Sequence, residues 1–276
     1  MKTTYAVAGL AATAHAFSPS GIFAQDVETQ EHRIPTTFES AVIGRRVLAL
    51  TKLATMSTVF PGKKSDGSAS ETELGLEGLP IGMMDYVADC EEEGDPTILE
   101  IKIATTFKNA RAGSNLTISM NWVPPYPPAR RMAFLSRLST YIPFFGKSNY
   151  NTSPAGTPDT VAYSAANLPR FALIGRLEDI NPDPVEAVKL GACFTAKHHD
   201  SRWWLPGNAI HESQWSRLVV EKVYFVGGFG DRAYIGWIPI EEWKSVTRSD
   251  WEAIRLPGEK PGWSEWSAQV EEVEDL

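Results

Sequence analysis

Four polar residues in the stretch TTFKNARAG, residues 105–113, carry groups that could bind a phosphate. The hydroxyls of Thr105 and Thr106, the amide of Asn109 and the ammonium group of Lys108 are donors that a phosphomonoester needs. The alternative is an ordinary turn between two strands, because clusters of charged residues are usually solvated. The local sequence favours the turn without excluding the phosphate site.

A second group of side chains with useful chemistry comes just before a predicted β-hairpin. His211, Trp215 and Arg217 lie on the approach to this hairpin, where they would rim a site at that end of the sheet. A structural histidine is the simpler interpretation of His211. The adjacent His198 and His199 could ligate a metal, but the chain has no H-E-x-x-H or C-x-x-C motif to complete the ligand set. We therefore expect no metal site.

The hairpin is the most strongly patterned part of the sequence. Residues 218–226 and 234–240 are mostly β-branched or aromatic, and the glycines between them supply a turn. The G-x-G-x-x-A pattern at 228–233 does not indicate a dinucleotide site, because a strand and not a helix follows it. Further strands are predicted at 53–60, 79–88, 98–103, 116–122 and 170–180. These elements predict a mainly β protein with flanking helices, arranged as a small antiparallel barrel.

The pattern inside these elements predicts which side chains face the core. Strand 116–122 should bury Leu116, Ile118, Met120 and Trp122, and strand 98–103 should bury Leu99, Ile101 and Ile103 while exposing Glu100 and Lys102. Two helices begin at capping boxes, formed by Thr36 with Glu39 and by Asp183 with Glu186. The second helix should pack through a stripe made of Val185, Val188, Lys189, Ala192, Cys193 and Ala196.

The acidic segment 89–95 and the overall charge limit the classes of ligand. Residues 89–95 lack the ligand spacing of an EF-hand loop, so we interpret them as a solvated turn. The formal net charge of -8 and the pI near 5.2 argue against a general nucleic-acid binder, which needs a basic face. After the N-terminus there is no apolar run of the length that a membrane span requires.

The N-terminal segment predicts secretion. Residues 1–16 resemble a signal peptide that ends in an A-x-A cleavage pattern. We expect a loose arm at 17–35, a single domain at 36–256 with a proline-rich insertion at 123–169, and an acidic tail at 257–276. An extracellular, secretory-pathway or vacuolar location would allow a disulfide between Cys90 and Cys193, with two separate thiols as the alternative. It would also allow glycosylation at the sequons of Asn115 and Asn151.

The ordered set of segments LATMSTVF, GLPIGMMDYVADC, DPTILEIKIATTFKNARAGSNLTISM, PRFALIGRLEDI and the hairpin block resembles a known family. Across residues 45–243 the chain is similar to the CREG-like group of the pyridoxamine-phosphate-oxidase superfamily, in the form of its secreted fungal members. The resemblance implies the FMN-binding split-barrel fold and a homodimer with a flavin site between subunits. It assigns the FMN phosphate to first-strand hydroxyls, here Thr55 and Ser57, and to the segment 105–109. A basic residue soon after a G-x-P step is also expected, but Ile81, Gly82, Met83 and Met84 follow Pro80.

Two functions follow from this resemblance. The first is an FMN-dependent oxidoreductase or flavin carrier, whose catalysis could be vestigial, and which holds FMN through Thr55, Ser57, Thr105, Thr106, Lys108 and Asn109. His211, Trp215 or Arg217 would then line the side that receives a small-molecule substrate. The second is a non-catalytic secreted glycoprotein that binds a protein or glycan partner through the barrel surface or the 123–169 insertion. The resemblance leaves the choice open, since a fold can persist after its ligand is lost.

Overall fold

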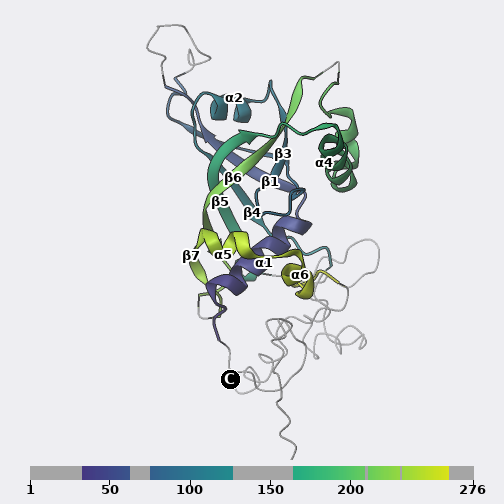
Figure 1. The fold of residues 1–276 in the computed structure, drawn as a ribbon. Helices are drawn as coiled ribbons and strands as arrows, with labels where there is room; N and C mark the ends of the chain where they lie inside the picture. The colour runs from purple at the N-terminus through teal and green to yellow at the C-terminus, as the bar shows by residue number, and fades with distance from the viewer. Residues whose placement is uncertain (1–32, 63–74, 127–163, 209–210, 231, 261–276) are drawn as a thin grey trace, which may run out of the picture.

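The computed structural model describes residues 33–62, 75–126, 164–208, 211–230 and 232–260. Within these residues, seven antiparallel strands form one sheet in the order β2-β1-β4-β5-β6-β3, and β7 pairs with β6 (Figure 1). The predicted signal peptide, Asn151 and most of the predicted insertion lie outside the described residues. The strands are β1 Leu53–Val59, β2 Pro80–Tyr86, β3 Thr97–Ile101, β4 Leu116–Asn121, β5 Arg170–Asp179, β6 Ser213–Val226 and β7 Ile235–Ile238.

The two ends of this strand order meet at a short bridge. Ala88, just after β2, pairs with Thr97 at the start of β3, and this bridge brings the edges of the sheet together as a barrel. The long β5–β6 pair changes register between Ile174 and Gly175. A Cβ atom at Gly175 would lie 1.9 Å from the carbonyl oxygen of Val219, so only glycine allows this close approach of the two backbones.

Strands β4 and β3 differ in how well their side-chain orientation was predicted. In β4 the alternation is confirmed, because Leu116, Ile118 and Met120 are buried while the residues between them are more exposed. In β3 the predicted half-exposed strand is wrong. Leu99 and Glu100 are 3% and 2% exposed, so both faces of the strand are covered. The strand contributes one face to the barrel interior and the other to a second apolar cluster.

Helices cover the two ends and one side of the sheet (Figure 1). Helices α1 (Thr37–Leu50), α5 (Ile240–Ser245) and α6 (Arg248–Ala253) lie towards one end, and α2 (Thr105–Arg111) lies at the other. Helix α4 (Pro184–Lys197) lies beside the sheet, and η3 (Ala165–Asn167) and η4 (His199–Trp203) are short 3-10 turns. Both predicted capping boxes are confirmed. No helix in these described ranges is long and apolar enough to cross a membrane.

Helix α4 packs through a different face from the one predicted. Leu190 and Phe194 are buried, whereas Val185 and Val188 are 63% and 72% exposed. The buried face joins a cluster that includes Leu99, Ile180 and Trp215. A disulfide between Cys90 and Cys193 attaches the helix to the segment after β2, which confirms one of the two alternatives for the cysteines.

Candidate functional site

The predicted phosphate-binding segment is a helix, α2, and its donors point in two directions. Residues three apart share a face of a helix, so Thr105 lies with Lys108 and Thr106 lies with Asn109. Thr106 and Asn109 are 5% and 4% exposed, and Asn109 Nδ2 donates a hydrogen bond of 3.2 Å to Thr58 Oγ1. Lys108 is exposed and Thr105 is half-buried. The predicted turn is therefore wrong, because the segment is a helix. Two of its four donors, Thr106 and Asn109, face the interior of the barrel.

The first-strand hydroxyls lie on the outer face of the barrel. Ala54, Met56 and Thr58 are buried, so Thr55 and Ser57, which alternate with them, face outward and are half-buried. Gly82 lies opposite Ser57 on β2, and a Cβ atom there would come within 3.2 Å of Thr55 Cγ2 and 3.3 Å of Ser57 Oγ. The glycine therefore leaves both side chains uncovered by β2.

A buried carboxylate beneath α2 gathers several polar groups that the sequence did not reveal. Glu100 on β3 accepts hydrogen bonds from Arg111 Nε at 3.0 Å and from Ser216 Oγ at 2.7 Å. Gln214 Nε2 donates to the same carboxylate at 3.1 Å, and Arg111 also pairs with Asp179. The hydrogen bond to Glu100 raises the pKa of Arg111 above its ordinary value, with Asp179 acting in the same direction. The uninterrupted TIL run before Glu100 was the signal that this strand is buried on both faces.

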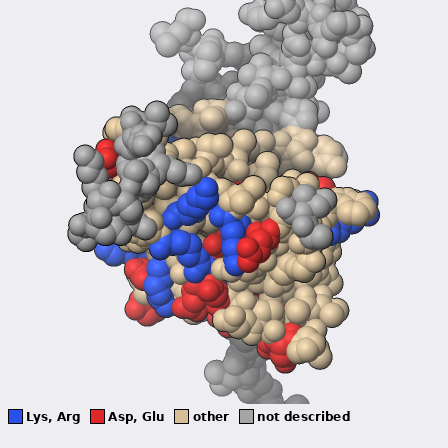
Figure 2. All heavy atoms as spheres, turned by 90° about the horizontal axis from the view of Figure 1, so that it is seen from above, with Lys and Arg blue, Asp and Glu red and all other residues tan. Residues whose placement is uncertain are grey.

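Charges of both signs lie side by side at the end of the barrel that α2 covers, as Figure 2 shows from above. Ion pairs at this end include Lys102 with Glu212 and Arg111 with Glu100 and Asp179. A strongly cationic surface that attracts phosphate needs an excess of positive charge, and these pairs reduce that excess.

The three predicted substrate-side residues have separate surroundings. Trp215 and Arg217 lie within β6 itself and not before it. Trp215 is 5% exposed and meets the ring of Phe194 edge-on at a centroid distance of 5.3 Å. His211 lies beside Trp204 at 5.5 Å. The structure therefore gives these residues packing contacts on the outer side of β6 and does not join them in one constellation.

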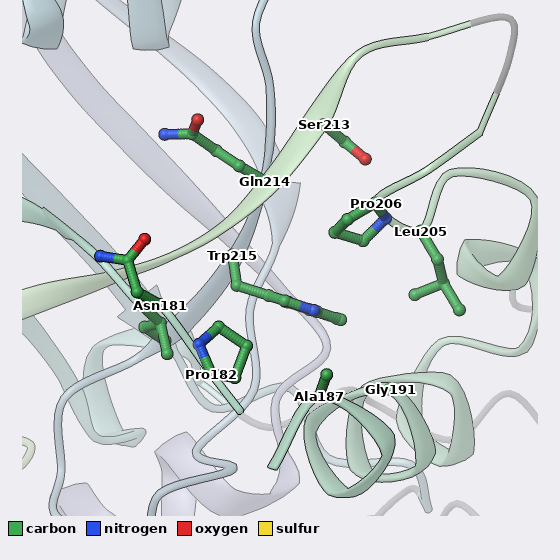
Figure 3. Close-up of a pocket in the computed structure, with 10 residues that line it drawn as sticks. Asn181, Pro182, Ala187, Gly191, Leu205, Pro206, Ser213, Gln214 and Trp215 are labelled. Carbon is green, nitrogen blue, oxygen red and sulfur yellow. The ribbon is translucent and has the colours of Figure 1, made fainter. Parts of the chain in front are cut away.

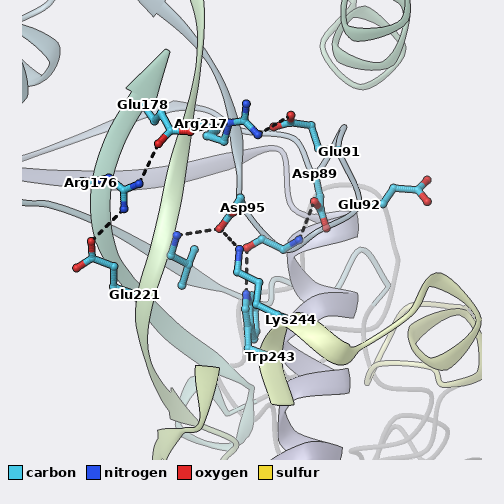
Figure 4. A network of polar contacts seen from close by, with 12 residues as sticks. Asp89, Glu91, Glu92, Asp95, Arg176, Glu178, Arg217, Glu221, Trp243 and Lys244 are labelled. Atoms are coloured by element: carbon cyan, nitrogen blue, oxygen red, sulfur yellow. Dashed lines mark hydrogen bonds and ion pairs between the residues drawn. The ribbon is translucent and has the colours of Figure 1, made fainter. Parts of the chain in front are cut away.

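Arg217 belongs to a network centred on the acidic segment 89–95 (Figure 4). It pairs with Glu91 at 2.9 Å, while Lys244 pairs with Asp95, whose Oδ1 also accepts from the Val220 backbone N–H at 2.8 Å. The prediction of a solvated turn is wrong, because Asp95 is 6% exposed. A segment this acidic can be buried because basic side chains from distant elements contact its carboxylates.

Arg45 of α1, which is 0% exposed, contacts the same acidic segment through Asp89 and Glu92. Its Nη2 donates to Asp89 Oδ2 at 3.0 Å and to the Glu92 carbonyl at 2.6 Å, and its Nη1 donates to the carbonyls of Trp243 and Val246. Burial raises the pKa of Asp89, and the charge of Arg45 opposes this shift. The arrangement is structural, since these groups bind one another and leave little room for a ligand.

The strand order separates the two predicted halves of a flavin site within one chain. The flavin candidates lie on β1 and α2, and the substrate candidates lie on or beside β6. Strands β4 and β5 separate β1 from β6 in one direction around the barrel, and β2 and β3 separate them in the other. The β1 candidates therefore lie on the wall opposite β6, whereas α2 covers one end of the barrel (Figure 1) and its Arg111 reaches Ser216 of β6. Among the described residues, there is no group of three or more His, Cys, Asp or Glu side chains arranged to hold a metal.

Comparison with solved structures finds several similar proteins. One solved structure similar to the chain is that of a heme binding protein from Mycobacterium smegmatis, which is 16% identical in sequence with a TM-score of 0.47. The match covers 76% of this chain and 61% of that chain. The heme storage protein HutZ from Vibrio cholerae has 14% identity over 71% of this chain and 98% of its own, with a TM-score of 0.37. A FAD and heme binding protein from Mycobacterium smegmatis has 12% identity over 71% and 79%, with a TM-score of 0.34.

No curated protein sequence matches the chain. The model of the CREG beta-barrel family, by contrast, matches residues 35–245, which is most of the sequence. This match agrees with the antiparallel sheet and flanking helices described above. The chain therefore belongs to the CREG beta-barrel family.

Proposed function

We propose that this chain is a flavin-independent binding protein that has kept the split barrel and acts by binding a partner. The observation that carries the proposal is the divergence of the phosphate donors on α2, because Asn109 is hydrogen-bonded to Thr58 inside the barrel while Lys108 lies on the surface. Flavin chemistry needs the substrate held close to the cofactor, since the protein's part is to position the two. Within one chain the candidates on β1 and those on β6 do not meet, so a second subunit would have to complete such a site.

The phosphate contacts support the same proposal. Thr106 and Asn109 face the interior, and Asn109 is hydrogen-bonded to Thr58. No arginine or lysine occupies positions 81–84 after Pro80, where a phosphate cation is expected. A charge-assisted contact contributes roughly 1.5–3 kcal/mol, so the loss of one weakens FMN binding by at least about tenfold.

We infer that the protein acts as a homodimer. Consecutive residues of a strand point to opposite faces, yet Met83 and Met84 of β2 are 54% and 71% exposed. Strand β2 therefore presents apolar side chains to water on both faces in the single chain. Exposed apolar surface of this kind marks an interface, and a second copy of the chain would cover it.

Secretion is the proposed context of this function. The Cys90–Cys193 disulfide suits an oxidising compartment, such as the secretory pathway, the extracellular space or a vacuole. Asn115 is exposed immediately before β4, which would allow a glycan there. The fungal type of the sequence and the signal peptide at 1–16 are proposed on the sequence patterns alone.

The test is an absorbance spectrum of protein secreted from a eukaryotic host, recorded before and after addition of FMN and gel filtration. We expect no flavin bands in either sample, with light scattering on the same column giving the mass of a dimer. Retained flavin at about one molecule per chain in the dimer would overturn the proposal and support the oxidoreductase, with the partner subunit completing the site. Lys108→Ala would then show whether Lys108 holds the phosphate.

A further inference from the structure

A pocket of about 450 Å³ lies between α4, the start of β6 and the turn after η4 (Figure 3). None of the flavin candidates lines it, so an inference about it does not rest on the proposed function. Its volume falls within the range of small-molecule sites, roughly 300–1,000 Å³. Most of its lining is apolar or lacks a side chain, and the residues that matter here are Pro182, Ala187, Gly191, Leu205, Pro206 and Trp215.

The polar groups around the pocket are largely engaged elsewhere. Figure 3 shows the amide groups of Asn181 and Gln214 directed away from the Trp215 ring. Gln214 Nε2 donates to Glu100 and Asp179, and Ser213 Oγ donates to the Trp204 carbonyl. Among the described residues that line the pocket, none is charged. An ion entering it would lose hydration without gaining a counter-charge, so the pocket favours an uncharged molecule.

One donor of the pocket has no partner. The indole N–H of Trp215 makes no hydrogen bond with any residue that the structure describes, and its nitrogen is not among the fully enclosed polar atoms, so it can be reached from the pocket. Water can satisfy this donor when the pocket holds no ligand, and the indole N–H of a mostly buried tryptophan usually finds an acceptor. A ligand that carries a carbonyl or another neutral acceptor would satisfy it.

Gly191 keeps the α4 side of the pocket open. It lies in the middle of α4, where glycine costs roughly 1 kcal/mol relative to alanine. Neither backbone conformation nor packing requires glycine there, because its φ is not in the left-handed region and a Cβ atom would meet nothing within 4 Å. Ala187 lies one turn earlier on the same face and is also small. The empty space beside Gly191 is the pocket itself.

We propose that this pocket binds an uncharged small molecule with an apolar ring and a hydrogen-bond acceptor. The ring would pack among Pro182, Leu205 and the Trp215 indole, and the acceptor would receive the indole N–H. The disulfide at Cys193, two residues from Gly191, attaches α4 to the barrel and so holds this wall of the pocket in place.

The test uses three probes of similar shape and different charge: benzamide, benzoate and benzamidinium. Saturation-transfer difference NMR on the full secreted protein should detect benzamide with an affinity of roughly millimolar, as expected for a ligand of this size. Benzoate and benzamidinium should bind at least about tenfold more weakly. Failure to detect benzamide, or equal binding of the charged probes, would overturn the proposal.

Substitutions then locate the probe. Gly191→Leu should fill the pocket and weaken benzamide binding at least about tenfold, while Ala192→Leu on the exposed side of α4 should leave it unchanged. Ala187→Leu fills the same space from the preceding turn and replaces Gly191→Leu if that variant does not fold. Benzamide binding that survives in a folded Gly191→Leu or Ala187→Leu variant would refute the assignment to this pocket.

Discussion

Replacing Arg45 by methionine should be among the most destabilising single changes in this protein. The substitution keeps a long side chain but removes the charge that faces Asp89, which is itself buried. It also removes the donors to the carbonyls of Glu92, Trp243 and Val246. Breaking a buried ion pair by deleting one partner costs about 3–5 kcal/mol, because the remaining charge stays buried without compensation. We expect a loss of this size in the free energy of unfolding.

The assay is urea unfolding at neutral pH and fixed protein concentration, followed by tryptophan fluorescence and far-UV circular dichroism. Fixed concentration matters because dimerisation would contribute to the measured stability. Arg176→Met is the matched control, since Arg176 also contacts two carboxylates, Glu178 and Glu221, but its side chain is 59% exposed. Exposed pairs contribute about 0–1 kcal/mol, so the control should differ little from the parent protein.

The pH dependence of the Arg45→Met variant provides a second measurement. Burial already raises the pKa of Asp89, and removing Arg45 should raise it further. A carboxyl group whose pKa is higher in the folded state takes up its proton there first, so stability falls as pH rises between the unfolded and folded values. Arg45→Met should therefore regain part of its lost stability as the pH falls from neutral towards the ordinary aspartate range. Equal losses for Arg45→Met and Arg176→Met would refute the reasoning.

Three further predictions concern other parts of the molecule. Burial lowers the pKa of Lys197 to about 8. Above that pH the unfolded state binds more protons than the folded state, so the free energy of unfolding should rise by up to about 1 kcal/mol per pH unit towards pH 10. Lys197→Met should abolish this slope in urea titrations. Met84→Lys should convert the proposed dimer to a monomer in sedimentation velocity, whereas Val188→Lys, at a similarly exposed position, should not; identical masses would contradict the proposed interface. Replacing both Cys90 and Cys193 by serine should lower the unfolding free energy by about 2–5 kcal/mol, and an unchanged urea midpoint would show that the crosslink is dispensable.

The sequence was informative wherever local chemistry decides the structure. The capping boxes at Thr36 and Asp183 place the starts of α1 and α4, because a side chain that caps a helix is only a few residues from the amides it binds. The alternation in β4 likewise predicted its buried face, since that strand has one wet side. Such signals depend on neighbours in the chain and can be recognised without knowing the fold.

The sequence was misleading where distant elements supply the environment. The alternating pattern predicts an exposed Glu100, because charged residues on such a strand usually face solvent. In the structure Arg111 neutralises its charge and Ser216 donates a hydrogen bond to its carboxylate. In the same way, no local sequence pattern around residues 89–95 indicates that Arg45 and Arg217 contact this segment. Ion pairs between elements far apart in sequence can be identified only after the strand order is known.

The placement of the candidate site residues has the same origin. A segment rich in donors, such as 105–109, can bind a phosphate only if its donors converge, and a helix distributes consecutive side chains around its axis. Once α2 forms, Asn109 turns inward to Thr58 and Lys108 turns to the surface. The residue types are those of a phosphate site, but the hydrogen bond from Asn109 to Thr58 joins α2 to β1 instead. A partner-binding function therefore accounts for the retained barrel with fewer assumptions than a flavin whose contacts are divided between the interior and the surface.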